Sequence, residues 1–432
     1  MFQRLSKAFL VVSILHLRVN AQSTTADRTS EVGEAAITDP NEECSPYSYP
    51  PVDNQLSSFP AIWEAASILP NDSTAQGKWN SISASIPSNI SVKTQPPASN
   101  YSSNDPDCWW TYSLCTEPKL SGLSADITAA PEPSTLGYGF DDGPNCSHNA
   151  FYDFLQGQNQ KATFYFIGSN VADWPLEAQR ALADGHEICA HTWSHPYMTT
   201  FTSEAAFAEL WYSTEVDSFV AMQMIKLAVG VTPTCWRPPY GDVDDRIRSI
   251  AHALGLQTIM WEYDSLDSDI NGNSITDQTV DTSYNNFIQT ANNGTFNYTG
   301  AIFLTHELNN FTMSEAVKFY PQFKSSFQHI VPVGVSLNKT QPYMETNYSL
   351  PTFEQYISGT VTVNGTRVSP NSTSSSGPES STSSDSLSST SSATVSGNGL
   401  PAASSSNAAD RLTDTGHHSI LPSILFLICY LL

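Results

Sequence analysis

The stretch Phe140-Asp141-Asp142-Gly143-Pro144 follows a short apolar run that starts at Leu136. The run predicts a strand over residues 136–140, and the Gly-Pro pair predicts a sharp bend directly after it. Two adjacent carboxylates repel each other, so one is protonated unless a cation or a basic group lies beside it. The pair therefore favours a division of roles, with one Asp on a metal ion and the other free as a base. Taken alone, the same five residues are more often a surface turn.

A second polar stretch, His191-Thr192-Trp193-Ser194-His195, follows a strand predicted at residues 187–190. Two histidines four positions apart on a turn or a short helix can direct both imidazoles at one ion. A lone pair with this spacing is usually two histidines with ordinary hydrogen-bond partners. The two histidines and a carboxylate from the end of another strand would together supply three protein ligands. The ion would then keep one coordination position for water. That arrangement is typical of a catalytic metal site.

Apolar, strand-like runs alternate with helical patterns from residue 136 onward. Strands are predicted at 136–140, 162–167, 187–190, 257–261, 301–305 and 329–335, and helices at 175–185, 203–230, 244–254 and 314–327. Repeated β-α units predict an α/β fold with a parallel sheet, either open or closed into a barrel. In such folds the chemistry collects at the carboxyl ends of the strands, where both polar stretches lie.

The composition limits the classes of partner. The 432 residues are 40% hydrophobic and 14% charged, which suits one large domain with appendages. A formal net charge of −24 argues against nucleic acid and anionic membrane surfaces as partners. Six of the seven cysteines precede the apolar C-terminal stretch, and their even number predicts up to three disulfides, with the pairing left open. The sequence has no Cys-x-x-Cys pair and so predicts no cysteine zinc cluster.

Both ends of the chain predict the secretory route. Residues 1–21 combine Arg4 and Lys7 with an apolar core and a small-residue cleavage site, as in a signal peptide. Residues 408–432 join a polar spacer to an apolar tail, as in a GPI-attachment propeptide, with Asn407 as the attachment residue. We therefore expect a protein that is secreted to the cell surface and anchored at the plasma membrane and the cell wall.

Three segments lie between these ends. Residues 22–130 are rich in Ser, Pro and Asn yet carry several tryptophans, and they predict an irregular extension packed on the main domain, which spans 131–360. Residues 361–407 are a Ser/Thr-rich tract that predicts a glycosylated stalk. Eleven sequons predict N-glycosylation at Asn71, Asn89, Asn100, Asn145, Asn293, Asn297, Asn310, Asn338, Asn347, Asn364 and Asn371.

Five motifs occur here in the order found in polysaccharide deacetylases. They are Phe140–Pro144, His191–His195, Arg237-Pro-Pro-Tyr-Gly241, the segment 264–267, and Leu304-Thr-His306. The chain thus resembles carbohydrate esterase family 4, with its NodB-homology domain, over roughly residues 131–340, and within it the fungal chitin deacetylases most. The resemblance implies a distorted (β/α) barrel and hydrolysis of N-acetyl groups from N-acetylglucosamine residues of chitin, giving chitosan and acetate.

The resemblance also implies a role for each motif residue. Asp142, His191 and His195 would bind one divalent ion, with Zn²⁺ preferred for this ligand set and Co²⁺ as a substitute. Asp141 would be the general base, paired with Arg237. The N–H of Tyr240 would contribute to the oxyanion hole, and Leu304 would line the pocket for the acetyl methyl group. His306 would protonate the leaving amine, with Asp267 keeping the imidazole protonated.

Two positions depart from the family pattern. Gly139 stands where Thr is usual, and Ser268 stands where the fourth motif usually has Trp. The missing indole predicts a larger or wetter wall near His306, and with it an altered preference among acetylated oligomers. Two alternatives remain open: an O-acetyl esterase of another polysaccharide, and a weakly active or non-catalytic glycan-binding wall mannoprotein. The expected partners are chitin or partly deacetylated chitin and, through the anchor, wall glucan, with the protein acting as a monomer.

Overall fold

The computed structural model describes residues 27–214, 223–270 and 275–360. The predicted signal peptide, stalk and GPI propeptide lie outside these residues, together with Asn364, Asn371 and Asn407. No helix among the described residues is long and apolar enough to cross a membrane.

Two parallel sheets form the centre of the fold. The first has the order β2-β3-β4-β5-β6, with β2 at Gly139–Gly143, β3 at Thr163–Phe166, β4 at Glu187–Ala190, β5 at Cys235–Trp236 and β6 at Gln257–Thr258. The second has the order β7-β8-β1-β9, with β7 at Tyr263–Asp264, β8 at Ala301–Leu304, β1 at Thr135–Gly137 and β9 at His329–Val331. The predicted α/β fold with parallel strands is confirmed.

A short bridge joins the two sheets at their carboxyl ends. The N–H of Asp141 donates to the carbonyl of Thr305 at 3.0 Å, and the N–H of Glu307 donates to the carbonyl of Asp141 at 2.8 Å. The first and the fifth motif therefore lie side by side. On the other side, β6 and β7 are the last strands of their sheets and are not neighbours in either, so the barrel is distorted.

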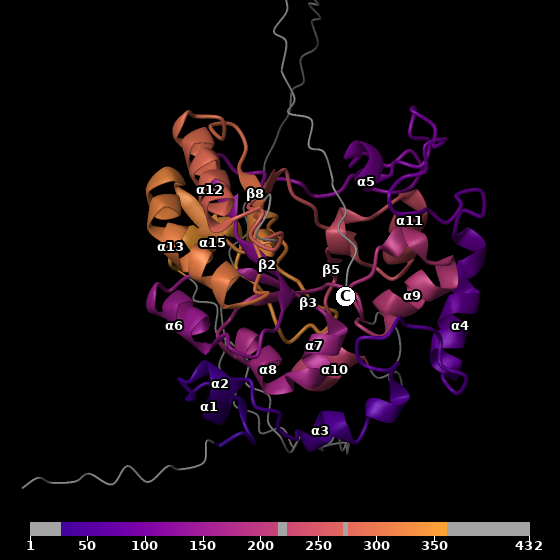
Figure 1. The fold of residues 1–432 in the computed structure, drawn as a ribbon, viewed down its shortest axis with the longest axis horizontal. Coiled ribbons are helices and arrows are strands. Elements are labelled where there is room, and N and C mark those ends of the chain that lie inside the picture. The colour runs from indigo at the N-terminus through magenta and orange to yellow at the C-terminus, as the bar shows by residue number, and fades with distance from the viewer. Residues whose placement is uncertain (1–26, 215–222, 271–274, 361–432) are drawn as a thin grey trace, which may run out of the picture. The chain divides into compact units, whose positions relative to one another are not determined.

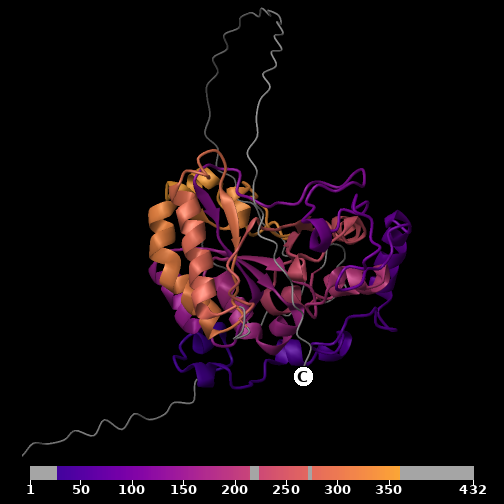
Figure 2. The ribbon, with the colours of Figure 1, turned by 45° about the horizontal axis from the view of Figure 1, so that its top comes forward.

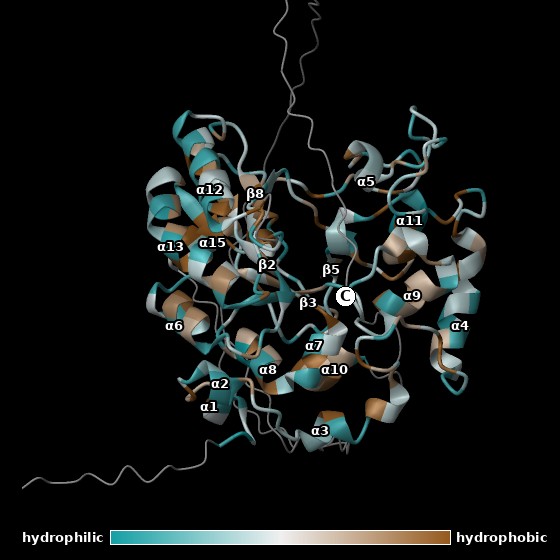
Figure 3. Ribbon diagram, in the orientation of Figure 1, coloured by the Kyte–Doolittle hydropathy of each residue, from teal (hydrophilic) through white to brown (hydrophobic). Residues whose placement is uncertain are grey.

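Helices surround these strands (Figure 1). The central strands are buried because both faces of a parallel sheet are covered, and every residue of β3 and β4 is buried. Figure 3 shows α10 as mainly hydrophobic and α11 as largely hydrophilic. The helices of the main domain are α6 Asn149–Gly157, α7 Gly168–Asp173, α8 Pro175–Ala183, α9 Ser203–Trp211, α10 Met224–Val229, α11 Asp245–Ala253, α12 Asp277–Asn292, α13 Asn310–Ser326, α14 Val333–Ser336 and α15 Phe353–Ile357.

Four predicted elements differ from the structure. The single strand predicted at 136–140 is two strands, β1 and β2, which belong to different sheets. The helix predicted at 203–230 is two helices, α9 and α10. The N–H of Met224, at the start of α10, donates to the carbonyl of Tyr212, which directly follows α9. The strand predicted at 329–335 ends at Val331, because Pro332 has no N–H to donate and instead opens α14. The strand predicted at 257–261 is reduced to Gln257–Thr258.

The extension is mostly loop with short helices and packs along the outside of the domain (Figures 1 and 2). Its helices are α1 Glu31–Glu34, α2 Pro40–Glu43, α3 Pro50–Asp53, α4 Ser73–Ile82 and α5 Trp110–Ser113. Helix α1 packs on α8, α3 on α10 and α4 on α9. Nearly every residue of α8 is buried, because the extension covers its outer face; the hydroxyl of Tyr47, for example, donates to Glu177 at 2.5 Å.

Three disulfides join the six cysteines of the described region. They are Cys44–Cys146, Cys108–Cys115 and Cys189–Cys235. The prediction of up to three disulfides is confirmed. The first of them links the extension to the loop that follows the Asp141-Asp142 pair.

Candidate metal centre and active site

Asp142, His191 and His195 converge at the carboxyl ends of β2 and β4. The Oδ1 atom of Asp142 lies 3.3 Å from Nε2 of His191 and 3.1 Å from Nε2 of His195. His191 donates through Nδ1 to the carbonyl of Arg237 at 2.7 Å. A carbonyl can only accept, so this bond fixes the tautomer that leaves the lone pair on Nε2, as metal-binding histidines require.

The donor set fits a divalent ion. The three ligand atoms lie within 4.8 Å of one another, and Oδ1 of Asp142 is buried without a hydrogen-bond donor among the described residues. Burial opposes ionisation of Asp142, but the imidazoles of His195 and His191 outweigh it and hold the pKa of this carboxyl well below its usual range. An ionised carboxylate and two imidazoles in this arrangement suit a transition-metal ion.

Asp141 lies beside the metal-ligand triad and is held by a buried ion pair. Its Oδ1 accepts from Nη1 of Arg237 at 2.6 Å, while its Oδ2 lies 3.8 Å from Nε2 of His191. The guanidinium of Arg237 is fully buried and lies 3.9 Å from the ring centroid of Tyr165. It also donates to the carbonyl of Ile259 at 3.3 Å. These contacts orient the arginine and leave one oxygen of Asp141 directed at the metal ligands.

His306 lies beyond the end of β8, beside Asp141. Its Nδ1 atom is 2.5 Å from Oδ1 of Asp267, and its N–H donates to Oδ2 of the same carboxylate at 3.2 Å. Burial alone would lower the pKa of this imidazole, but Asp267 first, and then Asp142 and Asp141, raise it to about 10. His306 is therefore an imidazolium at neutral pH and can give up a proton from Nε2.

Tyr240 and Leu304 line the same region. Tyr240 has a φ of 57°, and no acceptor for its backbone N–H is found in the part of the chain that the structure describes. Its exposed ring lies 4.6 Å from that of His195 and stacks on Tyr197, with the two ring centroids 4.0 Å apart. Leu304 is the last residue of β8 and is buried. Ser268, next to Asp267, is partly exposed.

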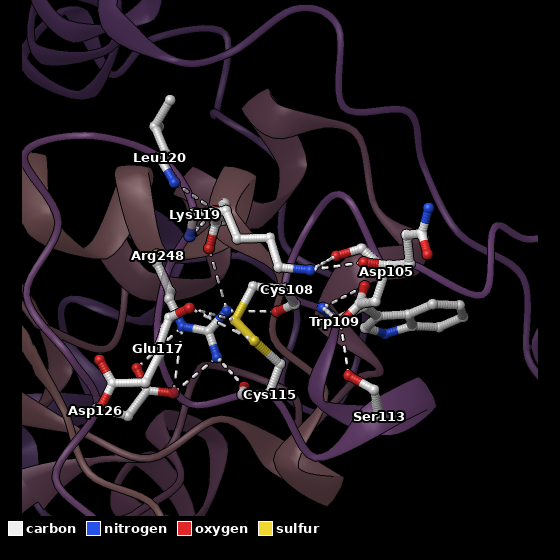
Figure 4. The surroundings of a disulfide bond; sticks show 12 residues. Asp105, Cys108, Trp109, Ser113, Cys115, Glu117, Lys119, Leu120, Asp126 and Arg248 are labelled. Carbon is white, nitrogen blue, oxygen red and sulfur yellow. Dashed lines mark hydrogen bonds and ion pairs between the residues drawn. A yellow bond between two sulfur atoms is a disulfide. The ribbon is translucent and has the colours of Figure 1, made fainter. Parts of the chain in front are cut away.

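The loop closed by the Cys108–Cys115 disulfide packs against α11 (Figure 4). Arg248 of α11 donates to Asp126 at 2.6 Å and to the carbonyls of both cysteines, at 2.6 and 2.8 Å. The loop thereby becomes a fixed part of the domain, although it belongs to the extension. Residues of this loop also contact the end of the third motif and the residue after it.

Gly241 and Asp242 form the contacts with this loop. A Cβ at Gly241 would lie 2.4 Å from the ring of Trp110, and the φ of Gly241 is +66°, so both the contact and the backbone require glycine. Asp242 is fully buried and accepts from the indole of Trp109 at 2.8 Å and the hydroxyl of Thr111 at 2.6 Å. The N-cap of α11 is Asp244, whose side chain accepts from the N–H of Ile247.

Sequence reasoning missed two further carboxylates near the metal centre. Glu307 is fully buried, and its Oε1 accepts from the N–H of Asn145 at 3.0 Å and lies 2.8 Å from Nδ1 of His148. Glu209 is also fully buried and contacts the backbone of the second motif. For Glu209 the available signal was an acidic residue within the apolar stretch 205–211. Glu307 follows His306 among mostly polar residues, where the sequence offers no such signal.

The sequons of the described region differ in exposure. Asn145 is half-buried, and its amide donates to the carbonyl of Leu308 at 2.7 Å. The others are exposed, at Asn71, Asn89, Asn100, Asn293, Asn297, Asn310, Asn338 and Asn347.

Comparison with known proteins places this site in a family. The model of the family described as polysaccharide deacetylase matches residues 129–259. The chain is 50% identical over 357 residues to chitin deacetylase 2 of Cryptococcus neoformans var. grubii, covering 81% of this chain and 76% of that protein. This chain belongs to the polysaccharide deacetylase family.

A second relative of this polysaccharide deacetylase agrees with that assignment. A chitin deacetylase of Amylomyces rouxii is 43% identical and is matched over 73% of this chain and 75% of its own length. Among solved structures, the chitin deacetylase of Colletotrichum lindemuthianum aligns with a TM-score of 0.45 at 23% identity, covering 51% of this chain and 96% of that one. Asp267, Leu304 and His306 lie beyond the segment matched by the family model.

Proposed function

We propose that this polysaccharide deacetylase is a metal-dependent chitin deacetylase, which hydrolyses the N-acetyl groups of N-acetylglucosamine residues to give chitosan and acetate. The observation that carries the proposal is the placement of three kinds of group beside one another at the carboxyl ends of the strands. These are the Asp142–His191–His195 triad, the carboxylate of Asp141 and the imidazolium of His306. The relatives named as chitin deacetylases, at 43–50% identity, support chitin as the substrate.

The triad would hold the ion, with Zn²⁺ as our first choice and Co²⁺ as a substitute. When bound, the ion polarises the acetamide carbonyl and lowers the pKa of water in its first shell. Nε2 of His191 is available for it because Nδ1 is already committed to the carbonyl of Arg237.

Asp141 acts as the general base. It removes a proton from the attacking water as the new C–O bond forms at the carbonyl carbon. Arg237 holds this carboxylate in place through a buried hydrogen bond of 2.6 Å. The free N–H of Tyr240 stabilises the negative charge that develops on the carbonyl oxygen. Leu304 lies at the end of β8, where it can contact the acetyl methyl group.

His306 acts as the general acid. An amine is a poor leaving group unless it is protonated, so the C–N bond breaks as the nitrogen takes the proton from Nε2. Asp267 keeps the imidazole charged until that step. The base and the acid lie on adjacent backbone segments because the sheets are bridged at Asp141 and His306.

We further propose that the protein is secreted and GPI-anchored at the cell surface and wall, with boundaries at residues 21, 130, 360 and 407. Three disulfides within the described region support an oxidising route. The catalytic groups all come from a single chain, which supports action as a monomer. Release of the protein from intact cells by a phosphatidylinositol-specific phospholipase would test the anchor, with Asn407→Gln as the variant.

Acetate release by the secreted ectodomain loaded with Zn²⁺ tests the activity. The substrates are a fully acetylated chitin hexamer, a partly deacetylated hexamer and acetylxylan, and Asp141→Asn is the control. We expect release from a chitin oligomer that disappears in the variant. Faster release from acetylxylan would instead favour an O-acetyl esterase. No release from any substrate, with the metal bound, would favour a glycan-binding protein.

A further inference from the structure

The turn that carries both histidine ligands is unfavourable by itself. Thr192 and His195 have φ values of +67° and +59°, the left-handed region in which a residue other than glycine costs roughly 1–2 kcal/mol. Within the turn, the hydroxyl of Thr192 accepts from the N–H of His195 at 3.1 Å. Two strained residues in a five-residue turn require support from the structure around it.

Glu209 of α9 supplies part of that support. Its Oε2 accepts from the N–H groups of Trp193 and Ser194 at 3.0 and 2.9 Å, and its Oε1 accepts from the hydroxyl of Ser194 at 2.8 Å. The carboxylate is fully buried, so these bonds are not exchanged with water. The residues it binds lie between the two histidine ligands.

A segment of the extension, residues 59–66, completes the support. The N–H of Ala66 donates to Oε1 of Glu209 at 2.7 Å. The carbonyl of Ala61 accepts from the indole N–H of Trp193 at 3.1 Å, and the ring of Phe59 stacks on that indole at 5.8 Å. Segment 59–66 lies outside the part of the chain that the family model matches, residues 129–259.

We propose that Glu209 and segment 59–66 are positioning elements that hold the His191–His195 turn in its metal-binding form. The extension is then a component of the metal centre, and metal affinity depends on a carboxylate that does not touch the ion. This inference rests on the metal site of the proposed function. It specifies which residues hold the metal ligands in position. Removal of a residue that orients metal ligands typically costs 10–100-fold in metal affinity.

The test measures metal binding, with Glu209→Gln as the variant. Gln keeps the shape of the side chain but places an NH₂ group against N–H donors. The matched control is Glu177→Gln, which alters another buried carboxylate at the same extension, bound to Tyr47 and not to the second motif. The readouts are the Zn²⁺ dissociation constant, from competition with a chromogenic chelator, and the visible absorption spectrum of the Co²⁺-loaded protein.

We expect Glu209→Gln to weaken Zn²⁺ binding by about 10–100-fold and to change the Co²⁺ spectrum, while Glu177→Gln leaves both unchanged. Zn²⁺ affinity within about threefold of wild type, or an equal loss in both variants, would overturn the proposal.

Should Glu209→Gln fail to fold, Trp193→Phe removes the indole N–H that donates to Ala61 and keeps a smaller aromatic ring beside Phe59. That variant is expected to weaken Zn²⁺ binding measurably, and an unchanged affinity would count against a role for segment 59–66. None of these outcomes depends on chitin: a protein that binds Zn²⁺ as expected but releases no acetate refutes the proposed activity alone.

Discussion

Replacement of Asp267 by Asn is expected to remove the proton that His306 delivers. Asp267 contacts His306 twice: its Oδ1 lies 2.5 Å from Nδ1 of the imidazole, and its Oδ2 accepts from the backbone N–H at 3.2 Å. Asn keeps the size of the side chain and can still accept a hydrogen bond, but it carries no charge. The change therefore isolates the electrostatic part of the interaction.

The magnitude follows from the pKa of His306. The difference between about 10 and the ordinary 6.5, at about 1.4 kcal/mol per pKa unit, corresponds to roughly 5 kcal/mol in favour of the imidazolium. Without the charge of Asp267, burial pulls the pKa down toward 6.5 or below. At about pH 7.5 the protonated fraction then falls from nearly one to about one-tenth or less.

The first assay is the pH profile of kcat for acetate release. In the wild type the alkaline limb reports the loss of the acid near pH 10, and in Asp267→Asn it should move down by two pH units or more. At about pH 7.5 we expect a loss of kcat of at least about tenfold. An alkaline limb that stays in place would refute the assignment of His306 as the acid.

Stability gives a second assay. Because the folded pKa lies above the unfolded one, the stabilisation by His306 is complete below about pH 6.5 and is lost as the pH rises toward about 10. Urea unfolding should therefore show a steeper loss of stability over this range in the wild type than in Asp267→Asn. Equal slopes would contradict the raised pKa.

Three further predictions concern other residues of the same candidate active site. Arg237→Ala leaves the charge of Asp141 buried and unpaired, so we expect a loss of about 3–5 kcal/mol in unfolding free energy and of nearly all acetate release; an unchanged denaturation midpoint would argue against the ion pair. Ser268→Trp should change the rate or the preference between fully and partly acetylated hexamers, and identical kinetics would remove Ser268 from the substrate site. Chelation should abolish acetate release and lower stability by about 3 kcal/mol if the ion was at 100 times its Kd. Asp142→Ala should lack this response in a thermal unfolding assay, and a chelator effect of equal size in that variant would mean that the ion binds elsewhere.

The order of the five motifs and the approximate positions of the longer strands were predictable from the sequence, whereas the two-residue strands β5 and β7 were not predicted. Asp141, His191 and His306 all follow apolar runs, and parallel strands place their carboxyl ends on one side of the fold. The helices starting at Pro175 and Ser203 and after Asp244 were also signalled locally, by a proline at the first turn or by a capping side chain. Such signals act within a few residues of the chain.

The tertiary structure decided how the site is supported. Glu209 and Ala66 are 143 positions apart, and the residues around each of them in the sequence do not predict their hydrogen bond. The pairing of Cys44 with Cys146 and the contact of Trp110 with Gly241 are equally remote. The sequence alone determined which residues can perform the chemistry, because residue type sets what a side chain can bind or protonate. Only the folded chain decided which carboxylates are buried and what they hold, because burial and hydrogen-bond partners depend on segments that meet through packing.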